Sequence, residues 1–282
     1  MGQPRVLVVG GGLTSAFLAH LLRREVSGVR LTVWDKARRP GGRMTSHRRE
    51  QGSRQIVDLG AQYITATLEH HHGGHAQVYR DLLRQGILRP MVREVATSGD
   101  TNRLELGGEK EEEREERSST RHTSVSLDDK YWEVPHQPDA ATTISRTLNY
   151  VAPAGVESVV NYFFAEAEVT VSSSQALTSL NLVGDSWEAS SHQHREMFDL
   201  VVTTLPVPQL LGTPPTPEGL ILGDWQERVK TDNEAVYEGL LRVSYNTVFT
   251  LGLFYNNTLP IHWKVKYLPK DPIIRSQYSL DK

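Results

Sequence analysis

Short apolar runs and amphipathic stretches alternate along the first part of the chain. Residues 5–9 (RVLVV) are a β-branched run that ends at a glycine, which predicts a buried strand. In residues 13–24 large apolar side chains recur at intervals of three and four, which predicts a helix with one apolar face. That face consists of Leu13, Phe17, Leu18, Leu21 and Leu22. Residues 30–35 alternate and end in Asp35, which predicts a second strand. A strand–helix–strand unit of about 30 residues favours a parallel sheet with a right-handed crossover.

The hydrophobic pattern continues after a break in the middle of the chain. Residues 105–121 carry seven acidic and four basic residues with little to bury, which predicts a solvated or disordered excursion. Helices are predicted over 76–86 and 155–167. A loop is predicted in the proline-rich stretch 206–217. Further strands are predicted over 168–183, 187–190, 198–205 and 243–255.

Composition narrows the class of protein. The chain has 282 residues, 38% of them hydrophobic and 23% charged, which is typical of a folded globular protein. There is no cysteine, which excludes disulfides, thiolate catalysis and cysteine metal sites. The formal charge of −3 provides no general attraction for nucleic acid. No apolar run approaches the length of a membrane helix, and the early run Val6–Val9 is too short for a signal peptide. We therefore expect a cytoplasmic monomer that binds neither nucleic acid nor a membrane.

The turn after the first strand carries the first chemical motif. Gly10, Gly12 and Thr14 belong to a Gly-x-Gly-x-x-Ser pattern, in which glycines allow a tight turn and let a pyrophosphate approach the backbone at the helix N-terminus. Asp35 ends the second strand, where an acid can accept ribose hydroxyls. The pattern predicts a dinucleotide site. The alternative is a glycine-rich turn with an incidental acid.

Two further segments extend this motif. Gly42 and Arg43 follow the second strand in PGGRM, where open backbone N–H groups and a forked cation suit a second contact with a diphosphate; the alternative is a surface turn. In DLGAQYIT, Gln62 and Tyr63 could present polar edges to a planar ring, although a plain strand explains the segment equally well. The histidines at 70, 71, 72 and 75 are interpreted as a solvated polar run, and no metal site is predicted.

These segments together carry a family resemblance. VLVVGGGLTSAFLA, VWDKARRPGGRMTS and DLGAQYIT resemble the FAD-binding segments of the flavin amine oxidase superfamily, and in particular of its renalase family. Later segments, among them YVAPAG, FDLVVTTLPVPQLL and YNTVFTLGLFY, resemble the same family in the same order. The resemblance implies an α/β fold, in which a Rossmann-like FAD-binding domain with a parallel sheet is interleaved with a smaller mixed-sheet substrate domain.

The resemblance also implies domain limits and contacts. The FAD-binding domain would comprise 1–75 and 149–210, and the substrate domain 76–95 and 211–282, with the charge-rich insertion at 96–148 between them. Because the family continues beyond the residue matched to Lys282, the substrate domain is expected to be incomplete. The implied contacts are Gly10, Gly12 and Thr14 with the pyrophosphate, Asp35 with the adenosine ribose, Gly42 and Arg43 with the diphosphate and flavin side, Gln62 and Tyr63 with the isoalloxazine, Leu177 with adenine through main chain, and Pro206 with the cofactor.

The activity that the resemblance implies is an FAD-dependent oxidase. Renalases oxidise wrongly reduced nicotinamide dinucleotides, the 2- and 6-dihydro isomers of NAD(P)H; the flavin takes the hydride, and oxygen takes the electrons to give hydrogen peroxide. No catalytic side chain is therefore predicted. Animal renalases are also described as secreted. Three alternatives remain: an amine oxidase of the same superfamily, a non-catalytic truncated isoform, and a classical NAD dehydrogenase.

Overall fold

The computed structural model describes most of the chain outside its central and C-terminal stretches. The described residues are 2–50, 55–67, 75–91, 95–96, 147–211, 221–245, 249–256 and 265–266. The predicted charge-rich excursion at 105–121 and three of the four clustered histidines lie outside them. Two compact units are present, one in the described residues of Met1–Pro90 and Arg146–Phe254 and the other in those of Met91–Ser145 and Tyr255–Lys282.

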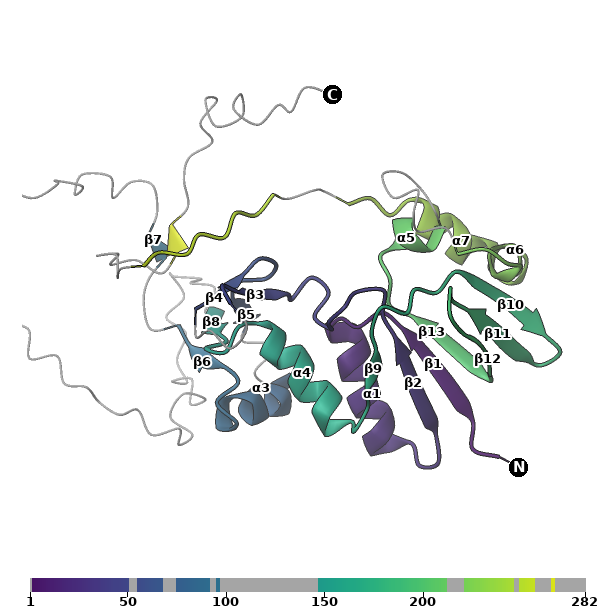
Figure 1. Cartoon of the computed structure of the whole chain (residues 1–282), viewed down its shortest axis with the longest axis horizontal. Helices are drawn as coiled ribbons and strands as arrows, with labels where there is room; N and C mark the ends of the chain where they lie inside the picture. Colours follow the sequence, from purple (N-terminus) through teal and green to yellow (C-terminus); the bar gives the residue numbers. More distant parts are fainter. Residues whose placement is uncertain are drawn as a thin grey trace, which may run out of the picture. The chain divides into compact units, whose positions relative to one another are not determined.

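A four-stranded parallel sheet is the centre of the first unit. Its strands are β1 (Arg5–Val9), β2 (Arg30–Trp34), β9 (Val171–Ser172) and β13 (Leu200–Thr203), in the order β13-β1-β2-β9. Helix α1 (Leu13–Glu25) connects β1 to β2, which pair in parallel from Arg5↔Arg30 to Val9↔Trp34. Figure 1 shows these strands fanning out side by side, with α1 beside them. The predicted strand–helix–strand unit is confirmed, and its parallel pairing places the ends of β1, β2 and β13 at one edge.

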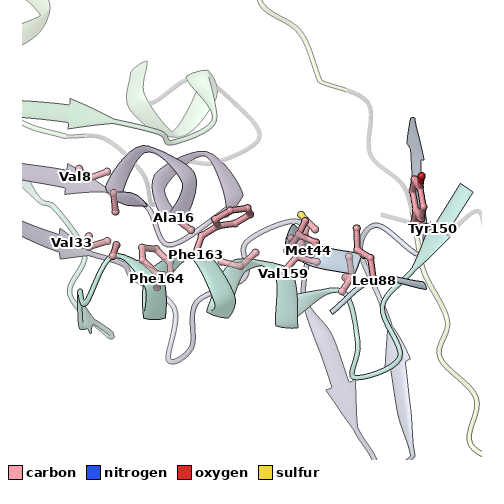
Figure 2. Close-up of a cluster of buried hydrophobic side chains, with 14 of the residues drawn as sticks. Val8, Ala16, Val33, Met44, Leu88, Tyr150, Val159, Phe163 and Phe164 are labelled. Atoms are coloured by element: carbon pink, nitrogen blue, oxygen red, sulfur yellow. The ribbon is translucent and has the colours of Figure 1, made fainter. Parts of the chain in front are cut away.

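Both faces of this sheet are buried, because alternate residues of β1 point into different hydrophobic clusters. Val6 and Val8 join the cluster that contains α1 and α4 (Glu157–Glu166). Leu7 and Val9 join a second cluster with Trp34 and Phe198. A strand buried on both faces is expected to be a continuous apolar run, as RVLVV is. Figure 2 shows the first cluster, which runs from Val8 and Val33 past Phe163 to Leu88 and Tyr150.

Helix α1 contacts the core differently from the prediction. Its fully buried residues are small, namely Ser15, Ala16 and Ala19. The larger residues Phe17 and Leu18 are only partly buried, and Leu13 is 37% exposed. Small side chains allow the helix axis to approach the sheet closely, whereas the predicted leucine face is turned partly away. The leucine face therefore lines a groove, described below.

Smaller sheets and helices complete the first unit. Strands β3 (Ser46–Arg48) and β4 (Ile56–Asp58) form an antiparallel pair, and β5 (Ile64–Thr67), β8 (Thr147–Val151) and β6 (Arg89–Pro90) form a three-stranded sheet. An antiparallel sheet of β10 (Ser179–Val183), β11 (Ser186–Ser190) and β12 (Arg195–Phe198) contributes to the second cluster. The remaining helices are α3 (His75–Arg84), α5 (Val207–Leu211), α6 (Trp225–Asp232) and α7 (Glu234–Leu241). In the second unit β7 (Val95–Ala96) pairs in parallel with β14 (Val265–Lys266).

Several boundaries differ from the sequence predictions. The stretch 168–183 holds two strands in different sheets, β9 and β10, rather than one. The strand predicted over 198–205 is divided between β12 and β13 at Asp199, whose backbone N–H bonds the carbonyl of Arg5. The predicted proline loop begins with helix α5, since prolines are tolerated in a first helical turn. The described residues 243–245 and 249–255 contain no strand, although 243–255 was predicted to be β-rich.

Candidate functional site

The glycine-rich turn after β1 is shaped by backbone contacts. Gly10 has φ +110° and donates its N–H to the carbonyl of Trp34 at 2.8 Å, so it needs the conformational freedom of glycine. Gly12 caps α1 with an extended backbone (φ −89°), and a Cβ placed there would meet no atom within 4 Å. The backbone of Gly12 therefore does not require glycine, and the missing side chain leaves the space beside it open.

Asp35 closes the turn from the end of β2. Its carboxylate accepts the N–H of Gly11 on Oδ2 at 2.8 Å and the N–H of Ala37 on Oδ1 at 3.0 Å. The side chain is buried, with 8% of the residue exposed. Each carboxylate oxygen has two acceptor positions, so each keeps one position for a further donor such as a ribose hydroxyl. Asp35 thus has a structural role in the turn besides the ligand role predicted from sequence.

A second glycine turn packs directly on the first. The N–H of Gly41 donates to the carbonyl of Gly11 at 2.8 Å. A Cβ at Gly42, which has φ +56°, would lie 3.2 Å from the Cα of Gly12. The two turns predicted as separate diphosphate contacts therefore meet at Gly12 and Gly42 and form one cradle.

The cradle is the floor of a cavity of about 440 Å³. Helix α1 begins there with no side-chain cap and no acidic residue in its first turn, so its first backbone N–H groups are open to a ligand. Lys36 and Arg43 also line the cavity, and among the described residues neither has an ion-pair partner. Open N–H donors, two cations and a missing Cβ are the features that a diphosphate requires. The residues present thus fit a dinucleotide such as FAD.

Most of the residues predicted from sequence line this cavity. They are Gly10, Gly12, Thr14, Asp35, Gly42, Arg43 and Pro206. Gln62 and Tyr63 are not among the lining residues; they follow Ala61, whose N–H bonds the carbonyl of Arg43 at 3.0 Å. Leu177 is not among them either; its side chain packs into the second hydrophobic cluster, whereas the contact implied for it is through main chain.

Among the lining residues that sequence reasoning missed, three have polar side chains. Lys36 follows the acid of the second strand directly, and its charge beside a phosphate motif was an available signal. Thr204 and Gln209 come from the end of β13 and from α5. Thr204 is held by a hydrogen bond from its Oγ1 to the carbonyl of Val9 at 3.0 Å. No local motif marks these two positions, since only the pairing of β13 with β1 brings them to the cradle.

A second cavity, which we call the α1–α3 groove, begins beside the first. It has a volume of about 460 Å³ and shares Leu13 and Thr14 with the cradle. Its walls come from α1 and α3, and Val159 and Phe163 of α4 also line it. The lining contains no carboxylate, lysine or arginine; the residues concerned are Leu13, Thr14, Phe17, Leu18, Leu21, Ile64, His75, Val78, Tyr79, Leu82, Val159 and Phe163.

Two tyrosines beside this groove are perturbed by burial. The rings of Tyr79 and Tyr150 stack with centroids 5.6 Å apart. Burial raises the pKa of the Tyr150 phenol to about 12, with a smaller contribution from Tyr79. Burial also raises the pKa of Tyr79. Both side chains therefore stay neutral near pH 7.

The described ranges contain neither a candidate metal site nor a helix that could span a membrane. In that part of the chain, no group of three or more His, Asp or Glu residues is placed to hold a metal ion. None of its helices is both long and apolar enough to cross a membrane.

Comparisons with known proteins agree with the class that this fold and site define, a Rossmann-like dinucleotide-binding protein. The model of the NAD(P)-binding Rossmann-like domain family matches residues 8–82. Renalase from Mus musculus is 32% identical over 274 residues, which cover 96% of this chain and 64% of the mouse protein. The chain is thus similar to renalase over nearly all of its own length. It spans less than two thirds of the length of that relative, namely 64%.

One solved structure shows a weaker similarity. It is the crystal structure of a candidate protoporphyrinogen oxidase from an Exiguobacterium species, with 14% identity and a TM-score of 0.47. The match covers 77% of this chain and 63% of that chain. A similarity of this degree supports no conclusion about function.

Proposed function

We propose that the cradle holds the diphosphate of FAD and that the chain supplies the cofactor-binding part of a flavin-dependent oxidoreductase. The observation that carries this proposal is the meeting of two glycine turns at Gly12 and Gly42, below an uncapped helix and beside two cations that form no ion pair with the described residues. A diphosphate carries about two negative charges, which Lys36 and Arg43 can neutralise. The free acceptor positions of Asp35 can bind ribose hydroxyls.

The residues of this chain bind and orient, and the cofactor brings the redox chemistry. When bound, FAD would supply the redox chemistry by which a hydride from the reduced substrate and a proton from solvent convert oxygen to hydrogen peroxide. Thr14 lies in the first turn of α1, where its hydroxyl can add a donor to the open backbone N–H groups. Pro206 and Thr204 close the side of the cavity formed by β13. The chain's predicted part in catalysis is to hold the cofactor in one orientation.

For the substrate we propose the 2- and 6-dihydro isomers of NAD(P)H, with hydrogen peroxide as the product from oxygen. The support is the similarity to renalase over nearly the whole chain. The test is peroxide production by the FAD-loaded chain with each dihydro isomer and with a primary amine. Peroxide from the amine alone would favour the amine oxidase alternative, and none from either would favour a non-catalytic role.

Cofactor binding is tested separately from activity with a glycine substitution. Because the backbone at Gly12 suits any residue and a Cβ there meets open space, Gly12→Val should fold normally and fill the cradle. The matched control is Gly239→Val, since Gly239 of α7 also has no atom within 4 Å of its Cβ position. We expect the flavin absorption bands to remain with the parent and the control after desalting, and to be lost with Gly12→Val. Equal retention by Gly12→Val would refute the assignment of the cradle.

A further inference from the structure

A partly buried polar cluster joins the start of helix α4 to the strands β3 and β4. These strands follow the turn at residues 40–44, which we call the arginine turn. Asp58 Oδ1 accepts the hydroxyl of Ser46 at 2.6 Å and the N–H of Val156 at 2.9 Å. Ser46 Oγ in turn accepts the N–H of Glu157 at 3.1 Å. Val156 and Glu157 begin helix α4, whose own N-cap residue provides no side-chain acceptor. Ser46 and Asp58 therefore cap α4 from about a hundred residues away in the sequence, at separations of 111 and 98.

The residues after Asp58 hold the backbone of the arginine turn. The N–H of Leu59 donates to the carbonyl of Thr45 at 3.1 Å, and the N–H of Ala61 donates to the carbonyl of Arg43 at 3.0 Å. A Cβ at Gly60 would collide with that same carbonyl oxygen, so the two segments are in close contact. The turn is attached at its other end by the bond from Gly41 to Gly11.

The Arg43 side chain has no such attachment to the described residues. It is exposed, and none of the described residues forms an ion pair with it. Its approach to the cradle is therefore set by its backbone, and the backbone is held by the segment that Asp58 begins. Asp58 itself lines neither the cradle nor the α1–α3 groove.

We propose that Asp58, acting with Ser46, is a positioning residue that directs Arg43 toward the diphosphate site without touching the ligand. This inference rests on the proposed FAD site and adds a residue to it. The alternative role for Asp58 is that of a helix cap, which would change stability but not the pose of Arg43. The two roles differ in what happens at the arginine turn itself.

The first test needs no cofactor. Trypsin cleaves after arginine, so the rate of cleavage after Arg43, followed by mass spectrometry in the full apo chain, reports how well the turn is held. Asp58→Ala should raise that rate about tenfold, since it removes two acceptor contacts beside the turn. Asp58→Asn keeps an oxygen acceptor for both donors and should restore most of the protection.

The control is an acid with similar bonds elsewhere. Asp224 accepts the N–H of Leu182 at 3.0 Å and the guanidinium of Arg228 at 2.8 Å, and it lines neither cavity. Asp224→Ala should lower the melting temperature without changing cleavage after Arg43. Each variant is digested at the same number of degrees below its own melting temperature. Equal rates of cleavage after Arg43 in Asp58→Ala and Asp224→Ala would then overturn the positioning role. If Asp58→Ala does not fold, Ser46→Ala provides the same comparison, because it retains the bond from Val156 to Asp58.

The second test is a double-mutant cycle on FAD affinity. Arg43→Ala and Asp58→Ala should each weaken FAD binding about tenfold, because the first removes the cation and the second misplaces it. In the Arg43→Ala background, Asp58→Ala should then change affinity less than about twofold. If the two losses of FAD affinity multiply in the double variant, Asp58 does not act through Arg43. A parent chain that binds no FAD would refute the proposed function, while the trypsin result would still decide whether Asp58 positions Arg43.

Discussion

Replacing Asp35 offers a sharp test of how the cradle is built. The carboxylate accepts the buried N–H of Gly11 and the partly buried N–H of Ala37, which is an exposed residue. A hydrogen bond to a charged group is worth about 1.5–3 kcal/mol, and a buried donor left without a partner bears the larger loss. Because water can replace the acceptor at Ala37 but not at Gly11, we expect Asp35→Ala to lower the free energy of unfolding by about 2–4 kcal/mol. Asp35→Asn should lose less, since its amide oxygen keeps one of the two bonds.

The assay for Asp35 is urea unfolding of the apo chain, with Asp185→Ala as the control. Asp185 is an exposed acid in the turn between β10 and β11 and should change stability by no more than about 0.5 kcal/mol. A loss below about 1 kcal/mol for Asp35→Ala would show that the carboxylate contributes little to the turn. A large loss of FAD affinity with unchanged stability would instead assign Asp35 to the ligand alone.

Three further predictions concern the cations, the core and alkaline pH. Arg43→Ala should weaken FAD binding by about 1–3 kcal/mol and make the affinity less sensitive to salt, as measured by fluorescence titration at two salt concentrations; unchanged affinity would leave Arg43 as a surface residue. Phe163→Ala should destabilise the chain by about 3–5 kcal/mol in urea, because Phe163 is 4% exposed and packs edge-on against Phe17; a cost near zero would mean that this cluster is loosely packed. The raised pKa of Tyr150 means that burial stabilises its neutral form, so this contribution to stability is present below pH 10 and is lost as pH rises toward 12. The melting temperature should therefore fall more steeply between pH 9 and 12 for the parent than for Tyr150→Phe. Parallel plots of melting temperature against pH would contradict the burial effect.

The central sheet and most of the cradle could be predicted because their signals are local. A continuous apolar strand, a Gly-x-Gly turn and an acid at the next strand end occur within about 30 residues, which is the length of one strand–helix–strand unit. The burial of the small residues Ser15 and Ala19 in α1 could not be predicted, because large apolar residues dominate the hydrophobic periodicity of the sequence. In α1 the buried residues are the ones that pack most closely against the sheet.

The rest of the site could not be predicted because it depends on contacts between distant segments. Thr204 reaches the cradle through the pairing of β13 with β1, nearly two hundred residues apart, with Val9 facing Thr203. Asp58 reaches α4 across 98 residues. Neither position carries a residue type or spacing that marks such a contact in advance. The break of the predicted 198–205 strand at Asp199 has the same origin, since the bond from Asp199 to Arg5 defines where β13 begins.

The α1–α3 groove has a consequence for how this protein is handled. Dyes such as anilinonaphthalene sulfonate fluoresce on exposed apolar surface and are used to detect loosely packed states. A groove of about 460 Å³ lined by leucine, valine and aromatic side chains gives the folded chain a dye-binding surface of its own. Bright dye emission from a fresh preparation would then reflect a well-packed molecule, and dye-based melting curves would start from a high baseline. Tryptophan emission is the better probe of unfolding, because Trp34 and Trp225 are buried in the second hydrophobic cluster, away from the groove lining.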